Sequence, residues 1–334
     1  MTHVPSVPAD SSPNREISRR SLLQWSGAAG LAGMLATLLP PSTREAFAQL
    51  TETVGGSSFT PIRPPAVSLA VRSMYLSTWS PSNNLAGTWP MFWNGHTTAL
   101  TGIVRVDGTA YVFCGAPNGG YPLATQTAFT LTSTRSTYVQ TAGPVTLTVA
   151  FLSPVDPDNL QRQCVPLSYL TVDAASNDGG SHSVSVYLDI SGEWAHGDTS
   201  QQLTWAEQTV GNQVVLTSQP ANPTVLGEYG DQASWGTVVW STDNVAGTTW
   251  QTGADSVVRA NGAAGSLPNT DDPNFRAINN NWPVFGLNRA LARSARPAPR
   301  RCSSSATSGR RRCPISAPAT TPGGASTGPA GRPC

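Results

Sequence analysis

The chain has 334 residues, only 12% of them charged, and a formal net charge of +1. The charge is unevenly distributed: residues 49–288 hold sixteen acids against seven Arg, whereas residues 289–334 hold nine Arg and no acid. An acidic central region argues against nucleic acid as a partner, because phosphate binding needs a basic face. About 240 residues can bury a substantial core, as one large or two small domains.

Residues 1–48 carry the parts of an export signal in the expected order. Arg19 and Arg20 precede a Gly/Ala-rich apolar run, and Ala46 and Ala48 are small residues where a signal peptidase would cleave. The alternative is a membrane anchor, for which the short, Gly-containing run is marginal. The sequence therefore predicts a cleaved twin-arginine signal, no stable membrane anchor, and a secreted or periplasmic protein.

The central region reads as strands separated by short turns. A hairpin is expected around Asp107-Gly108, since this pair suits a tight turn. Apolar residues alternate with small or polar ones from Val145 to Phe151 and from Val184 to Ile190, which predicts strands with one buried face. Further strands are expected over 125–132, 165–174, 213–218, 233–241 and 248–258. With no sustained helical period, the pattern predicts an all-β, antiparallel β-sandwich. We expect a lead-in and small β subdomain over 49–120 and the sandwich over 121–288.

The cysteines and histidines of this region give little support for a metal or cofactor. Cys114 and Cys164 could form one disulfide, or both could be free buried thiols. No CxxC, HExxH or His cluster is present. The sequence predicts no cofactor and no metal site.

Two segments are candidates for function. Residues 87–96 are dense in aromatic and turn residues, and Trp93 with Asn94 suggests either a platform for a small polar ligand or a plug at one end of the sandwich. Residues 190–198 place Glu193, His196 and Asp198 just after a clear strand, where loops commonly carry functional groups. Their alternatives are acid–base chemistry, a structural loop, or a contact with a neighbouring domain; no GxSxG nucleophile motif accompanies them.

The composition changes abruptly after Asn288. Residues 289–334 contain no aromatic residue and three of the five cysteines. One hypothesis is that this tail is translated out of frame, because GC-rich DNA in a wrong frame yields Arg, Ala, Pro, Ser and Gly. The alternative is a natural disordered tail.

Long strings of the chain are similar to the N-terminal part of the glutaminase A family of secreted fungal and bacterial proteins. They include TWPMFWNG at residues 88–95, FLSPVD at 151–156, LQRQCVPLSY at 160–169, DISGEWAHGD at 189–198, ASWGTVVW at 233–240 and WPVF at 282–285. The resemblance runs from about Pro61 to Asn288.

The resemblance implies an enzyme that hydrolyses L-glutamine to glutamate and ammonia, with β-rich N-terminal domains joined to a larger helical domain. That helical domain should begin after residue 285 and is absent here; no known catalytic residue falls on this chain. We therefore expect a truncated, non-catalytic portion in which Trp93, Asn94, Glu193, His196 and Asp198 face the missing domain or its cleft. Glutamine would be the substrate only of the intact enzyme, and the oligomeric state stays open. The alternative from another class is a secreted sandwich that binds carbohydrate through its Trp residues.

Overall fold

The computed structural model describes residues 64–291 and 313–316, and nearly all of its regular elements are strands. In chain order they are β1 Val67–Val71, β2 Ser77–Ser80, β3 Met91–Phe92, β4 Leu100–Val106, β5 Thr109–Cys114, β6 Thr125–Leu131, β7 Arg135–Ala142, β8 Val145–Leu152, α4 Leu160–Cys164, β9 Leu167–Ser176, β10 Val184–Ser191, the 3-10 helix η3 Gly192–Trp194, β11 Leu203–Val210, β12 Gln213–Pro220, β13 Glu228–Tyr229, β14 Gln232–Ala233, β15 Val238–Asp243, β16 Thr248–Ala254, α5 Asp255–Ala264, β17 Pro283–Ala290 and β18 Cys313–Ser316. Among these residues no helix is long and apolar enough to cross a membrane.

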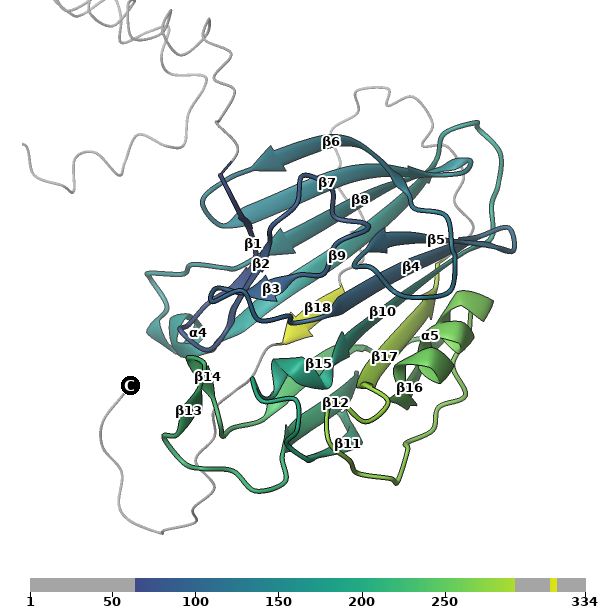
Figure 1. Cartoon of the computed structure of the whole chain (residues 1–334). Helices are drawn as coiled ribbons and strands as arrows, with labels where there is room; N and C mark the ends of the chain where they lie inside the picture. Colours follow the sequence, from purple (N-terminus) through teal and green to yellow (C-terminus); the bar gives the residue numbers. More distant parts are fainter. Residues whose placement is uncertain (1–63, 292–312, 317–334) are drawn as a thin grey trace, which may run out of the picture. The chain divides into compact units, whose positions relative to one another are not determined.

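Two five-stranded sheets form the body of the structure (Figure 1). One has the order β16-β17-β10-β4-β5 and the other β18-β9-β8-β7-β6, with antiparallel neighbours throughout. Apolar side chains of β4 and β10 share one core with those of β7, β8 and β9. The predicted all-β sandwich is confirmed.

The predicted alternation matches the buried faces of both sheets. Val145, Leu147, Val149 and Phe151 of β8 are at most 1% exposed and face the core. On β10, Val184, Val186, Leu188 and Ile190 point to the same core. The Asp107-Gly108 turn has positive φ at both residues, as the hairpin requires. Each strand therefore has the register that its apolar residues demand.

The smaller sheets extend this body. The order β1-β2-β3 forms one, β11-β12-β15 another, and β13-β14 is a two-stranded hairpin. The division expected near residue 120 stays a prediction. Strands from both sides of it share one sheet, because β4 pairs with β5 and with β10.

The strand expected over 248–258 is wrong in its second half, because α5 begins at Asp255. Its Val257-Val258 pair suggested a strand, but the following Arg-Ala-Asn-Gly-Ala-Ala and the left-handed Gly265 favour a helix with a regular end. The helix covers the outer face of the first sheet: Val258 and Ala263 pack with Ile103, Tyr187 and Val284. Gly262 is needed there, since a Cβ would lie 2.3 Å from the Tyr187 ring.

A buried ion pair fixes α5 to the sheet. Arg259 donates to both carboxylate oxygens of Asp189 at 2.9 and 3.1 Å, and Asp189 is fully buried. Tyr187 donates its hydroxyl to the same carboxylate at 2.7 Å. Asp255 accepts a further hydrogen bond from Arg259, whose guanidinium also lies over the Trp89 ring. Both charges of this buried pair thus have a partner, as burial requires.

A second charged contact ties the β4–β5 turn to the loop before β10. His182 lies between two carboxylates, with Nδ1 2.5 Å from Asp107 and Nε2 2.9 Å from Asp178. The hydrogen bond to Asp178 is the largest cause that raises the pKa of His182, and that of Asp178 is lowered to about 2. We call these three residues the His182 clasp.

The two cysteines do not pair with each other. Cys114 is fully buried in β5, where burial raises the pKa of its thiol, and Cys164 is exposed at the end of α4. The expectation of two buried thiols therefore holds for Cys114 alone.

The structured part continues past the compositional break. β17 runs two residues beyond Asn288 to Ala290, and Arg289 is buried, so the boundary expected at 288 is too early. The cause is sheet pairing: Arg289 lies between Val186 of β10 and Thr248 of β16. The signal residues Arg19, Arg20, Ala46 and Ala48, and the tail residues 292–312 and 317–334, lie outside the described residues.

Candidate functional site: a loop cluster at one end of the fold

Three segments distant in the sequence meet at one end of the molecule: residues 89–98, 191–198 and 228–235, which we call the loop cluster. The Asn94 side chain donates to the Gly230 carbonyl, and Gln232 Nε2 donates to the Glu193 carbonyl at 3.3 Å. Figure 1 shows β3 and the β13–β14 hairpin on the same side of the structure. The cluster brings together the two segments that the sequence singled out.

The first segment presents Trp93 and Asn94 from a tight turn after β3. Asn94 Oδ1 accepts from the His96 amide at 2.8 Å, and Gly95 has φ 92°. The turn projects Trp93 outward, and the residue is 58% exposed. Trp93 is therefore no plug of the sandwich, whereas Trp89 is packed against Arg259.

Glu193 is held inside the cluster by η3. Its Oε2 accepts from the Ser191 hydroxyl at 2.7 Å and from the Ala99 amide at 3.3 Å, and only 6% of the residue is exposed. Burial raises the pKa of Glu193, while these hydrogen bonds lower it. Since Ser191 is equally buried, the pair joins η3 to β10 and offers no exposed nucleophile.

His196 is also buried, and its ring faces Tyr229 with the ring centroids 6.0 Å apart. Nδ1 accepts from the Asp198 amide at 2.9 Å, so the proton of the neutral ring is on Nε2. Burial lowers the pKa of His196, and nearby His96 lowers it further. Burial also lowers the pKa of His96. The imidazoles of His96 and His196 are therefore neutral at neutral pH and suit hydrogen bonding more than ion pairing.

Asp198 has a local structural role. It accepts from the hydroxyl and amide of Ser200 and from Gln201 Nε2, which closes the turn before β11. The Ser200 hydroxyl is the largest cause that lowers the pKa of Asp198. The described geometry does not place its carboxylate with that of Glu193 in an acid–base pair.

The cluster contains buried polar atoms without a hydrogen-bond partner in the described part of the chain. They are His96 Nε2, Gln232 Oε1 and Trp235 Nε1. Such atoms are costly unless something satisfies them. The role of the 228–235 segment was not predictable from the sequence, because its contacts with residues 94 and 193 are long-range; its Trp and turn residues were the only local signal.

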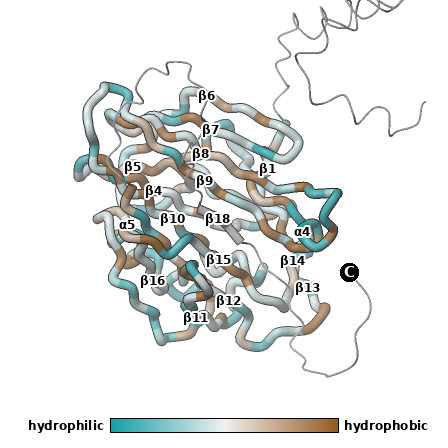
Figure 2. Tube along the Cα trace, turned by 180° about the vertical axis from the view of Figure 1, so that it is seen from behind, coloured by the Kyte–Doolittle hydropathy of each residue, from teal (hydrophilic) through white to brown (hydrophobic). Residues whose placement is uncertain are grey.

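Exposed apolar side chains lie in or near the loop cluster. Trp93 and Tyr229 belong to the loop cluster, Val225 and Leu226 lie just before its third segment in the chain, and Met74 precedes Tyr75; each is more than half exposed. Tyr75, next to Met74, bonds Glu228 and packs on Trp235. Figure 2 shows hydrophobic colour in the loop beside β13. A surface with apolar side chains and unpartnered polar atoms is typical of a protein–protein or interdomain contact.

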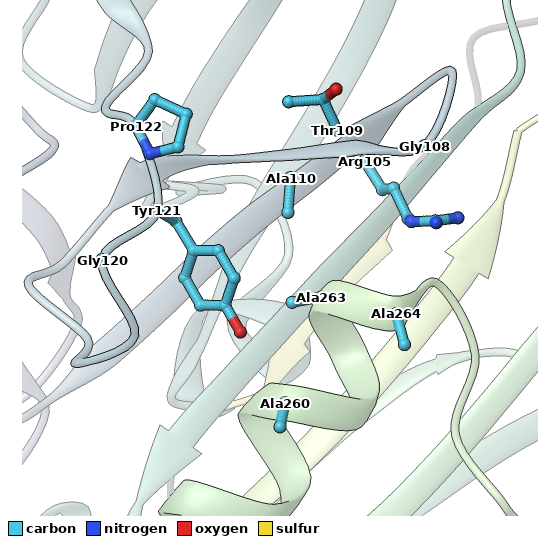
Figure 3. A pocket seen from close by; sticks show the side chains of 10 residues that line it. All are labelled: Arg105, Gly108, Thr109, Ala110, Gly120, Tyr121, Pro122, Ala260, Ala263 and Ala264. Carbon is cyan, nitrogen blue, oxygen red and sulfur yellow. The ribbon is translucent and has the colours of Figure 1, made fainter.

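An open pocket lies elsewhere. It measures about 440 Å³ and lies between the β4–β5 hairpin, residues 120–122 and α5. Figure 3 shows Tyr121 directed toward Ala263, with Arg105 on the other wall. None of the predicted site residues lines it.

The comparisons with known proteins match almost the whole described region. Residues 134–303 match the family described as "Domain of unknown function (DUF5127)". The chain belongs to the DUF5127 family. Residues 46–119 match "Domain of unknown function (DUF4964)". The DUF5127 match passes Asn288 and reaches residue 303.

Relatives of this DUF5127 member include proteins named as glutaminases. Over 246 residues it is 44% identical to "Glutaminase A" of Aspergillus oryzae, which covers 70% of this chain and 35% of that protein. It is 28% identical over 257 residues to "Probable glutaminase" of Arthroderma benhamiae, covering 69% of this chain and 29% of that one. The predicted resemblance is confirmed: the chain is homologous to a segment of glutaminase A and spans about a third of these relatives' length.

The export signal is confirmed as well. Residues 16–36 match the twin-arginine translocation pathway signal sequence. The match includes Arg19 and Arg20, and it directs the protein out of the cytoplasm. Cleavage after Ala48 stays a prediction.

Proposed function

We propose that this chain is the N-terminal, non-catalytic part of a secreted amidohydrolase that converts L-glutamine to glutamate and ammonia. In the complete enzyme the loop cluster packs against the downstream domain and forms one wall of the substrate cleft. The chain alone is inactive.

The proposal rests on the homology of this chain to a segment that makes up 35% of the length of a glutaminase A. The loop cluster adds physical support, because it combines exposed Trp93 and Tyr229 with the buried, unpartnered atoms of His96, Gln232 and Trp235. A second domain would cover the apolar side chains and supply hydrogen-bond partners. Glu193 and Asp198 are already engaged, so their role is to hold the loops in place.

A reconstitution experiment tests the proposal. The chain without residues 1–48 is assayed for ammonia release from L-glutamine, alone and mixed with the remaining two thirds of the Aspergillus oryzae relative expressed separately. We expect no ammonia from the chain alone, and co-elution with restored ammonia release in the mixture. Activity of the chain alone would refute the non-catalytic role.

Variants locate the contact on the loop cluster. Trp93→Ala and Asn94→Ala should weaken co-elution about tenfold or more, as truncation of a central contact residue does. Val210→Ala is the matched control, since Val210 is 56% exposed at the far end of β11. If Val210→Ala weakens binding as much as Trp93→Ala, the loop cluster is not the contact. Binding of the chain to polysaccharide, lost in Trp93→Ala, would favour a carbohydrate-binding module instead.

The tail hypothesis has its own test. Sequencing the gene downstream of the codon for Leu291 should show a reading frame for the remaining domain in another phase. If no such frame exists, the tail is natural and the frameshift is refuted.

A further inference from the structure

A second group of buried polar side-chain atoms lies on β15 and β17, outside the loop cluster. All of the atoms considered in this group can donate hydrogen bonds. Arg289 of β17 is 7% exposed, yet its Nη1 has no hydrogen-bond partner in the described part of the chain. No ion pair joins Arg289 to a carboxylate among residues 64–291. A guanidinium is always charged in proteins, and a buried charge without a counter-charge is strongly unfavourable.

Two more donors face the same space. Trp240 and Thr242 of β15 are each 2% exposed, and Trp240 Nε1 and Thr242 Oγ1 also lack partners among the residues that the structure describes. Residues two apart on a strand share a face, so both side chains point the same way. On β17, Leu287 and Arg289 likewise share a face, while Asn288 points to the opposite side and donates to the Gly265 carbonyl.

The two faces enclose a small cavity. It measures about 20 Å³ and is lined by Arg289, Trp240 and Thr242 together with the apolar Val186, Leu188 and Leu287. A cavity above roughly 10–15 Å³ holds one water-sized particle. Ser241 and Asn288 complete the lining. Each alternates with these residues along its strand, so its side chain points to the opposite face, and the three donors are the main polar side chains of the cavity.

We propose that this cavity is a binding site for a small monatomic anion of the halide class, with chloride as the physiological ligand. One anion accepts from Arg289, Trp240 and Thr242 at once and neutralises the guanidinium. A water has two lone pairs, so it satisfies at most two of these donors and leaves the charge uncompensated. The proposal is independent of the proposed function, since it concerns the joint between β15 and β17.

Thermal unfolding in matched salts tests the site. The purified mature chain is melted in sodium chloride, bromide and gluconate at equal ionic strength, because gluconate is too large for the cavity. Binding to the folded state alone raises the Tm, and we expect about 2–4 °C in chloride or bromide over gluconate. Equal Tm values in the three salts would overturn the proposal.

Variants assign the effect to these residues. Arg289→Met should abolish the halide-specific shift, whereas Arg135→Met, which removes an exposed Arg of β7, should leave it unchanged. Thr242→Val keeps the side-chain volume and should reduce the shift by at least half, so the test survives if Arg289→Met fails to fold. An undiminished shift in Thr242→Val and in any folded Arg289→Met chain would refute the site.

A crystal grown in bromide gives a direct readout. We expect an anomalous peak within contact distance of Arg289 Nη1 and Trp240 Nε1. A water or an empty cavity there, at a bromide concentration that saturates the thermal shift, would show that the shift arises elsewhere.

Discussion

Neutralising Asp189 is the sharpest test of how α5 is held on the first sheet. Asp189→Asn keeps the shape but removes the charge that faces Arg259. Removing one partner of a buried ion pair costs about 3–5 kcal/mol in free energy of unfolding, because the other charge is left uncompensated. Here Asp255 remains 3.1 Å from Arg259, and the Trp89 ring lies 5.2 Å from its guanidinium carbon. We therefore expect the lower end, about 3 kcal/mol.

The assay is urea and thermal unfolding of the mature chain. A loss of about 3 kcal/mol corresponds to a Tm lower by about 6–12 °C for a domain of this size. The control is Asp156→Asn, which breaks the exposed contact with Arg162 at 3.7 Å and should cost about 0–1 kcal/mol. The double variant Asp189→Leu/Arg259→Met removes both charges, and we expect it to be more stable than Asp189→Asn.

The result that refutes this reasoning is a small effect of Asp189→Asn. If it lowers the Tm no more than Asp156→Asn does, the ion pair is not what holds α5. If the double variant is less stable than Asp189→Asn, the contact between the side chains matters more than their charges.

Three further predictions concern local features. His182→Gln should destabilise the chain most between about pH 4 and 6.5. Above this range the charged His182 clasp weakens, because pH rises through the raised pKa of His182. Below it the clasp weakens as pH falls from 3.8 toward the Asp178 pKa of about 2. Urea midpoints of both proteins across pH 3–9 check this, and a constant difference would contradict it. Gly262→Ala should cost about 1–3 kcal/mol in thermal unfolding through overpacking on Tyr187; an unchanged Tm would mean that α5 moves freely. Leu226→Gly should lower the binding of an apolar fluorescent dye without lowering the Tm, because Leu226 is 78% exposed and has φ 61°, which suits Gly better; a lower Tm would show that the Leu side chain has a partner.

Much of the fold was predictable because its signals are local. The alternation from Val145 to Phe151 and the Asp107-Gly108 turn each determine a register within a few residues. The helix α5 was missed because Val257-Val258 favours a strand locally, while Tyr187 and Val284, which it covers, are distant in the sequence.

The candidate site was predictable only in part, and for the same reason. Trp93 and Asn94 stood out by composition, and so did His196. Their common neighbour, the 228–235 hairpin, meets Asn94 across 136 positions of the chain. The unpartnered donors of Arg289 and Trp240 depend on how two sheets face each other, which no local pattern of apolar residues encodes.

The position of β17 has a consequence for the order of events during synthesis. This strand, nearly the last of the described residues, pairs with both β16 and β10, so the first sheet has a gap in its middle until residue 290 has left the ribosome. The twin-arginine pathway carries proteins that are already folded. Export competence should therefore arise late and abruptly: a nascent chain stopped before Pro283 would leave two open strand edges in the cytoplasm, and one that includes Ala290 would close them.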